Sequence, residues 1–85
     1  MLYKTSIGLV DDEQKEVLTK ICSDIQEKDS TFKFLVLNCV NKKFKYRLVV
    51  ESQSRDQAFQ RGHWLIKKTG YPQLRYNVTE YPPKP

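Results

Sequence analysis

Apolar residues recur at helical spacing in two segments of the chain. In residues 12–28 and 55–69 they fall three to four positions apart, which places them on one side of a helix. The stripe of the first segment comprises Val17, Leu18, Ile21, Cys22 and Ile25. The stripe of the second segment comprises Ala58, Phe59, Gly62, Leu65 and Ile66. We therefore expect two amphipathic helices, each burying one side.

Both predicted helices have recognisable ends. Asp11 and Ser54 occupy N-cap positions, where a short polar side chain can accept a backbone hydrogen bond. Gln14 and Gln57 follow them by three residues, which is the spacing of a capping box. Gly70 follows the second segment directly, where a glycine commonly ends a helix.

Four further segments are rich in aromatic and branched residues and favour strands. They are residues 2–9, 31–40, 43–51 and 73–80. The middle two flank a short polar turn at Asn41 and Lys42, so we expect them to form a β-hairpin. In the last segment, apolar and polar residues alternate, as in a strand with one buried face.

The predicted order is strand, helix, strand, strand, helix, strand, which resembles the ferredoxin-like split βαβ arrangement. Right-handed crossovers in that arrangement put both helices on one face of a four-stranded antiparallel sheet. The expected class is therefore α+β, with the strands in the spatial order fourth, first, third, second. A chain of 85 residues has room for one domain, predicted over residues 1–81, with a proline-rich tail at 82–85. This topology hosts many functions and does not itself identify one.

If both helices cover one face, the other face is open to solvent or to a partner. In the segment 43–51, four aromatic and aliphatic residues alternate with a mainly cationic row. The first row is Phe44, Tyr46, Leu48 and Val50, and the second is Lys43, Lys45, Arg47 and Val49. Burying three cations beneath helices would cost several kcal/mol each. We therefore expect the first row to face the helices and the cations to face outward.

The segment 31–40 has apolar residues on both of its faces. Phe32, Phe34 and Val36 share one side, and Leu35, Leu37 and Cys39 share the other. Only one side can face the helices, so the other leaves apolar groups beside the cations. Such a row is a candidate binding surface. The alternative is that these residues are ordinary exposed apolar groups, or that the tail covers them.

Composition limits the class of protein. Hydrophobic residues make up 39% of the chain and charged residues 29%, as in globular proteins. No apolar run is long enough for a membrane span, and the first ten residues are too polar for a signal peptide. We therefore expect a cytoplasmic protein in which Cys22 and Cys39 are reduced.

The residues give no sign of catalysis. His63 is the sole histidine and is not at ligand spacing from either cysteine. The chain holds three glycines and no phosphate-binding glycine loop. We expect no enzyme activity, no metal, no cofactor and no small-molecule substrate.

The leading hypothesis is a small basic binding module. The net charge is +5, with the cations concentrated in the second half of the chain, which suits nucleic acid or an acidic protein. In the nucleic-acid hypothesis, cations of the open face contact phosphates, and an outward tryptophan flanked by two cations extends the surface. The candidate residues are Lys43, Lys45, Arg47, Arg75, Arg61, Trp64 and Lys68. The alternative is a protein-interaction module, either a homodimer through the sheet face or a small regulator or inhibitor that docks on an acidic partner.

Overall fold

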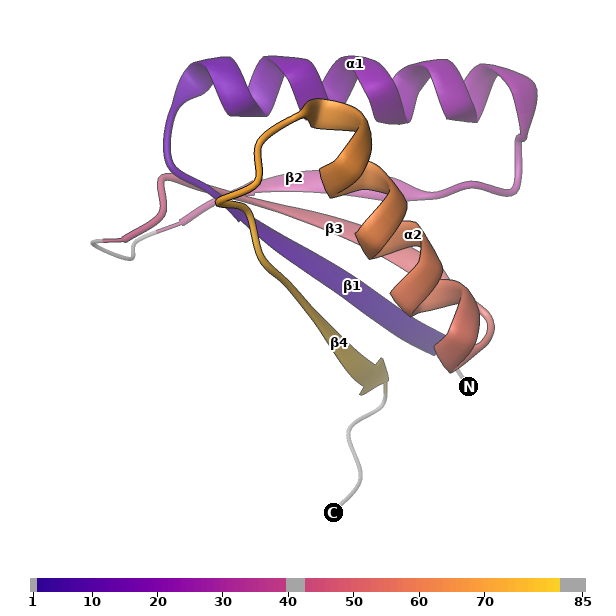
Figure 1. The fold of residues 1–85 in the computed structure, drawn as a ribbon. Coiled ribbons are helices and arrows are strands. Elements are labelled where there is room, and N and C mark those ends of the chain that lie inside the picture. Colours follow the sequence, from indigo (N-terminus) through magenta and orange to yellow (C-terminus); the bar gives the residue numbers. More distant parts are fainter. Residues whose placement is uncertain (1, 40–42, 82–85) are drawn as a thin grey trace.

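The computed structural model describes residues 2–39 and 43–81 and forms one sheet with two helices (Figure 1). The elements are β1 (Leu2–Leu9), α1 (Asp12–Lys28), β2 (Phe34–Asn38), β3 (Tyr46–Ser52), α2 (Arg55–Thr69) and β4 (Tyr76–Tyr81). Their order matches the predicted ferredoxin-like order. The predicted turn at residues 41–42 and the predicted tail at 82–85 lie outside the described residues.

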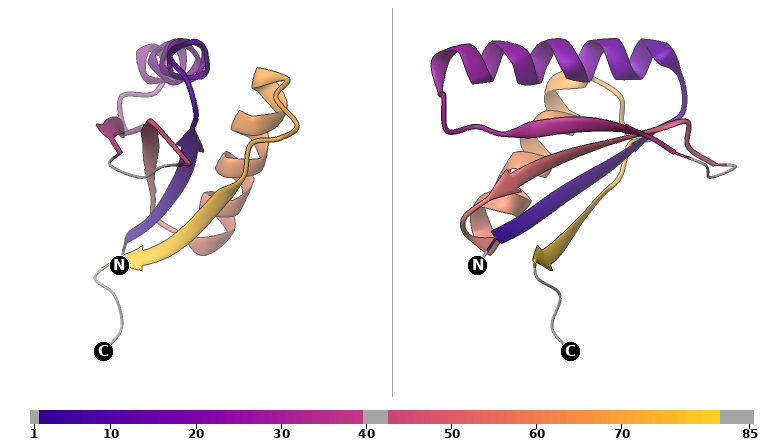
Figure 2. Two further views of the ribbon diagram at one scale, coloured as in Figure 1. Left: turned by 90° about the vertical axis from the view of Figure 1, so that its left-hand side faces the viewer. Right: turned by 180° about the vertical axis from the view of Figure 1, so that it is seen from behind.

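The strands lie in the order β2-β3-β1-β4, and each neighbouring pair is antiparallel, so the predicted spatial order is confirmed. Figure 2 shows both helices on the same side of the sheet. Side-chain contacts agree, because Thr5 of β1 donates to the Ala58 carbonyl of α2 and Tyr46 of β3 donates to Asp12 of α1. The opposite side is therefore an open face.

The core lies between the helices and this covered face of the sheet. Every second residue of β1 and β3 points into it, as the period of a strand requires. Its largest fully buried side chains are Ile7, Leu9, Leu18, Leu48, Leu65, Val50, Thr5 and Cys22. Phe34 and Val36 of β2 are half-buried against the same cluster. The helix-facing row predicted for the hairpin is therefore confirmed for Leu48 and Val50.

The helix ends form as the capping residues predict. Asp11 and Ser54 accept hydrogen bonds from the amides of Gln14 and Gln57, at 2.9 and 3.1 Å. The side-chain oxygen of each glutamine accepts a hydrogen bond from the amide of the residue before the cap. For Gln14 this is the amide of Val10, at 3.0 Å. Gly70 ends α2 with φ at 76°, a left-handed conformation that costs glycine little.

A glycine sets how closely α2 approaches the sheet. Gly62 is buried on the inner side of α2, against β1 and β4. A Cβ atom at this position would lie 2.7 Å from the Tyr76 ring and 2.9 Å from Thr5 Cγ2. Because Gly62 has no side chain, the backbone of α2 packs directly against the Tyr76 ring and the Thr5 methyl group.

Three strands differ from their predicted limits, and β3 is one of them because it spans Tyr46–Ser52 where the sequence predicts 43–51. β2 is shorter than the segment 31–40, because the amide of Phe32 donates to the Asp29 carbonyl in the connection from α1. β4 begins at Tyr76 rather than at residue 73, since the amide of Leu74 is bonded to the carbonyl of Tyr71 in a turn. β4 also includes Tyr81, which pairs with Leu2.

Candidate binding surface on the open face of the sheet

Two leucines lie on the open face at the edge of the sheet. Leu35 pairs with Val49 of β3, and Leu37 pairs with Arg47. Leu35 is 45% exposed and Leu37 is 48% exposed, so of the two apolar rows predicted for this segment, theirs is the one that faces outward. Val49 lies beside Leu35 on the same face and is 8% exposed. We call Leu35, Leu37, Arg47 and Val49 the leucine patch.

Phe44 extends this apolar surface toward β1, contrary to the sequence prediction that it faces the helices. Gly8 lies on the open face because its neighbours Ile7 and Leu9 point into the core. A Cβ atom at Gly8 would lie 2.6 Å from the Phe44 ring, so the ring lies over Gly8 on the open face. Placing Phe44 under the helices was therefore wrong, and an aromatic ring joins the leucine patch near Arg47, the cross-strand partner of Gly8.

Lys45 is the second departure, because its side chain turns toward α1 and not toward the open face. The Lys45 ammonium lies 3.2 Å from Asp12 Oδ1, and the Tyr46 hydroxyl donates to the same oxygen at 2.5 Å. Both contacts lower the pKa of Asp12, with the tyrosine hydrogen bond the larger cause. Lys15 of α1 also lies over the Tyr46 ring, 4.5 Å from its centroid. This cluster joins the start of α1 to β3.

The backbone explains both departures. Strict alternation of faces holds only where the chain is extended in a ladder. β3 begins at Tyr46, and residues 43–45 precede it as a bend. The amide of Lys45 donates to the Leu9 carbonyl at 2.8 Å, and its carbonyl accepts from Cys39 at 2.9 Å. The chain therefore turns at residues 43–45, which places Phe44 on the open face and Lys45 beside α1. Lys43 is exposed in the same bend.

Arg61 is directed at the sheet and not outward. Its guanidinium donates to the Glu51 carbonyl at 2.7 Å and to Ser52 Oγ at 3.3 Å. It also lies over the Phe32 ring, 5.1 Å from the centroid. Arg61 thus ties α2 to the end of β3 and is half-buried, so its prediction as an outward cation is wrong.

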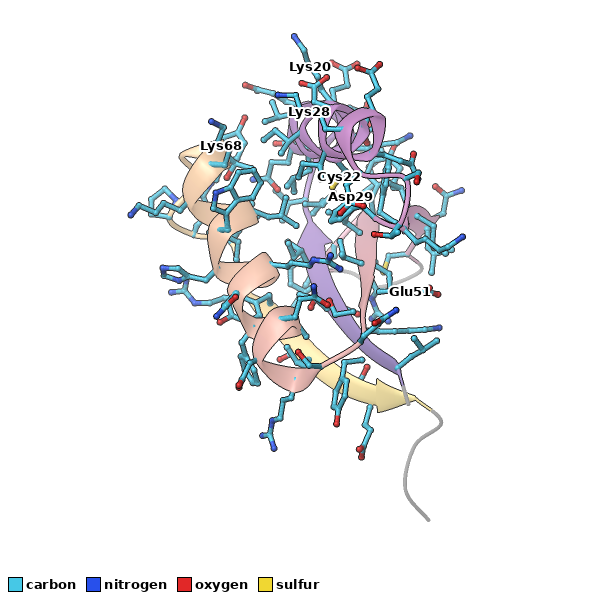
Figure 3. All side chains as sticks on the ribbon, turned by 90° about the vertical axis from the view of Figure 1, so that its right-hand side faces the viewer. Lys20, Cys22, Lys28, Asp29, Glu51 and Lys68 are labelled. Carbon is cyan, nitrogen blue, oxygen red and sulfur yellow. The ribbon has the colours of Figure 1, made fainter. Side chains whose placement is uncertain are left out.

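Trp64 is exposed as predicted, at 46%, and the Lys68 ammonium lies 5.9 Å from the centre of its ring. The indole forms one wall of a cleft of about 470 Å³ between α2 and the end of α1. The other lining residues are Ile25, Asp29, Phe32, Gln60, Arg61 and Leu65. Figure 3 shows Asp29 at the end of α1 and Lys68 on α2. The pattern of residues along the sequence gave no sign of this cleft.

Arg75 lies in the connection before β4. Its guanidinium donates to the carbonyls of Pro72 and Leu74, at 2.9 and 3.0 Å. The seven candidate residues therefore do not form one surface. Arg47 lies on the open face, Lys43 is exposed in the bend before β3, Lys45 joins α1, and Arg61, Trp64 and Lys68 belong to α2.

Two observations on the described residues concern metal binding and the Cys22 thiol. In residues 2–39 and 43–81, no group of three histidine, cysteine, aspartate or glutamate side chains could hold a metal ion. Burial raises the pKa of the Cys22 thiol to about 12. This thiol is therefore protonated at neutral pH and a poor nucleophile. Within the same part of the chain, neither helix is long and apolar enough to cross a membrane.

The chain has no significant match to a protein-family model, to a curated protein or to a solved structure.

Proposed function

We propose that this chain is a protein-binding module that docks on its partner through the leucine patch. The observation behind the proposal is that Leu35 and Leu37 lie next to each other on the open face, each nearly half exposed. Exposing adjacent leucines to water costs free energy, roughly 25 cal/mol per Å² of apolar area. A partner that covers them recovers this free energy, and Arg47 beside them offers a charged group at the rim.

The distribution of cations supports a protein partner more than a nucleic acid. Phosphate binding draws on several cations in one region. Of the cations predicted for this role, Lys45 is paired with Asp12, and the Arg61 guanidinium bonds to β3. Arg47 lies among apolar side chains, which suits the rim of a protein interface better than a phosphate channel.

Nucleic acid is the second candidate, and one observation favours it. The Phe44 ring lies over Gly8 on the open face, and Arg47 is the cross-strand partner of Gly8 on the same face. An aromatic ring beside a cation can stack a base and contact its phosphate. In that case the affinity falls steeply as salt is raised.

A photocrosslinking residue in place of Leu37 tests the proposal in the cell of origin. We expect a discrete protein adduct from position 37 and none from position 59. Phe59 provides the matched control because it is 40% exposed, but on α2 and not on the open face. Adding Leu35→Ser should remove the adduct. Equal adducts from both positions would contradict the proposal.

An anisotropy titration with labelled single-stranded RNA and duplex DNA tests the second candidate. Salt-sensitive binding that is lost in Arg47→Glu and retained in Leu35→Ser would favour nucleic acid over protein. An absence of binding at low salt would eliminate this candidate.

A further inference from the structure

β2 is an edge strand of the described sheet. In the described sheet, β2 pairs with β3 and has no strand on its other side. Such an edge is a template for a further strand, and proteins commonly protect it with a charged residue or a proline inside the strand. The strand Phe34–Asn38 contains neither. β2 is therefore an edge without these protections.

Hydrogen bonds at the two ends of β2 show which residues point toward β3. The Lys33 carbonyl accepts from Glu51 at 3.1 Å, and the Cys39 amide donates to Lys45 at 2.9 Å. In an antiparallel ladder, the amide and carbonyl of one residue point to the same side, and the side alternates along the strand. Odd-numbered residues of this segment therefore direct their backbone groups at β3.

The even-numbered residues direct theirs away from the sheet. The outward backbone groups are those of Phe34, Val36 and Asn38. The side chains divide differently, because Leu35 and Leu37 point to the open face while Phe34 and Val36 pack against the core. A strand added to this edge would bond to the even residues and lay its own side chains beside the two leucines.

The charges around this edge are complementary to an acidic partner. Lys33 precedes β2 directly and is exposed, and the exposed Arg47 is the cross-strand neighbour of Leu37. Glu51 of β3, labelled in Figure 3, is the acidic residue whose amide donates to the Lys33 carbonyl, and it is half-buried. The chain as a whole carries a net charge of +5. It therefore repels a second copy of itself and attracts an acidic segment.

We propose that β2 receives an extended segment of a partner protein as a fifth strand of the sheet, and that this segment carries apolar residues flanked by acidic ones. The inference rests on the proposed function and adds the mode of docking and the chemistry of the partner. Main-chain hydrogen bonds supply part of the affinity in this mode, and side-chain pockets supply specificity. A hollow of about 310 Å³, lined by Lys33, Leu35, Val49 and Glu51 among others, lies beside the strand and can take one partner side chain.

Hydrogen exchange with a synthetic peptide tests this mode of docking. The probe is a short peptide in which valine and threonine alternate between paired glutamates, and a version with lysines replacing the glutamates is the control. We expect the glutamate peptide to protect the amides of Phe34, Val36 and Asn38 from exchange. The amides of Leu35 and Leu37 are already bonded to β3 and should change little.

One variant removes an outward amide without removing a bond to β3. Asn38→Pro deletes an outward amide at an exposed position, which an edge strand tolerates. Asn38→Ala is the matched control because it retains the amide. We expect the proline variant to bind the glutamate peptide about tenfold more weakly, and the alanine variant to bind it like the natural chain. Circular dichroism confirms that both variants fold.

Three outcomes would overturn the inference. Equal binding of the lysine peptide would refute the acidic partner. Protection of the even amides without peptide, rising with protein concentration, would show that a second copy occupies the edge. Absent protection by the glutamate peptide would refute strand addition, and crosslinking from position 37 would still decide the proposed function separately.

Discussion

Replacing Gly62 with alanine has two effects on the stability of the fold, and they are opposite in sign. In an exposed helix this change stabilises by about 1 kcal/mol, because alanine is the better helix former. At this position the added Cβ meets the Tyr76 ring at 2.7 Å and Thr5 Cγ2 at 2.9 Å. Contacts this short require α2 or the two side chains to move.

The packing penalty should exceed the gain in helix propensity. Thr5 is fully buried, and its hydroxyl is bonded to the Ala58 carbonyl at 2.8 Å, so it has little room to move. Overpacking a well-filled core costs about 1–3 kcal/mol. We expect Gly62→Ala to destabilise the protein by about 1 kcal/mol, which lowers the melting temperature of a domain this size by about 4–8 °C.

Thermal unfolding followed by circular dichroism measures this effect. Gln60→Ala is the control because Gln60 is exposed on the same helix, and it should change stability little. In a Tyr76→Ala background, the penalty of Gly62→Ala should shrink because one of its two close contacts is gone. A higher melting temperature for Gly62→Ala alone would refute the close approach of α2 to β1 and β4.

Three further predictions concern the ends of the helices and the cysteines. The contacts of Tyr46 and Lys45 lower the pKa of Asp12 below its ordinary 3.8. The ionised carboxylate therefore stabilises the fold above this pH, and this contribution to stability is lost as the pH falls below about 4. Thermal melts from about pH 5 to pH 2 should therefore show a smaller loss of stability for Asp12→Asn than for the natural chain. Ser54→Ala removes the N-cap of α2 and should cost about 1 kcal/mol in urea unfolding, whereas Ser54→Asp should retain most of it. Alkylation by iodoacetamide near neutral pH should modify the half-buried Cys39 before the buried Cys22, as mass spectrometry can show, and faster reaction at Cys22 would contradict its burial.

The elements that are defined by local patterns could be predicted from the sequence. The limits of α1 and α2 match their predicted ranges because caps such as Asp11 and Ser54 act within one helical turn. Alternation also predicted that β2 turns one of its two apolar rows outward, and only the structure shows that this is the row of Leu35 and Leu37.

The sequence predictions that proved wrong concern side chains whose direction is not set by the period of a strand or a helix. Alternation predicted the faces of Phe44 and Lys45 wrongly because the chain bends just before β3. Gly8 was the available signal, since a glycine within a strand often marks the close approach of another group. Arg61 was placed outward by helical period alone, whereas its long side chain reaches the Glu51 carbonyl. Such reach depends on tertiary neighbours, which periodicity does not contain.

The central place of β1 has a consequence for how the chain folds. Thr5 pairs with Val50 on one side and with Val78 on the other, so both neighbours of β1 lie far along the sequence. Among the strand pairs that the structure describes, β2–β3 alone joins segments that are close in the sequence. Domains dominated by such distant pairings fold in milliseconds to seconds, slower than helical bundles of the same size. We expect a nascent chain that ends before Tyr76 to lack a stable sheet, because it loses the pairing of β4 with β1 and the packing of Tyr76 against the core.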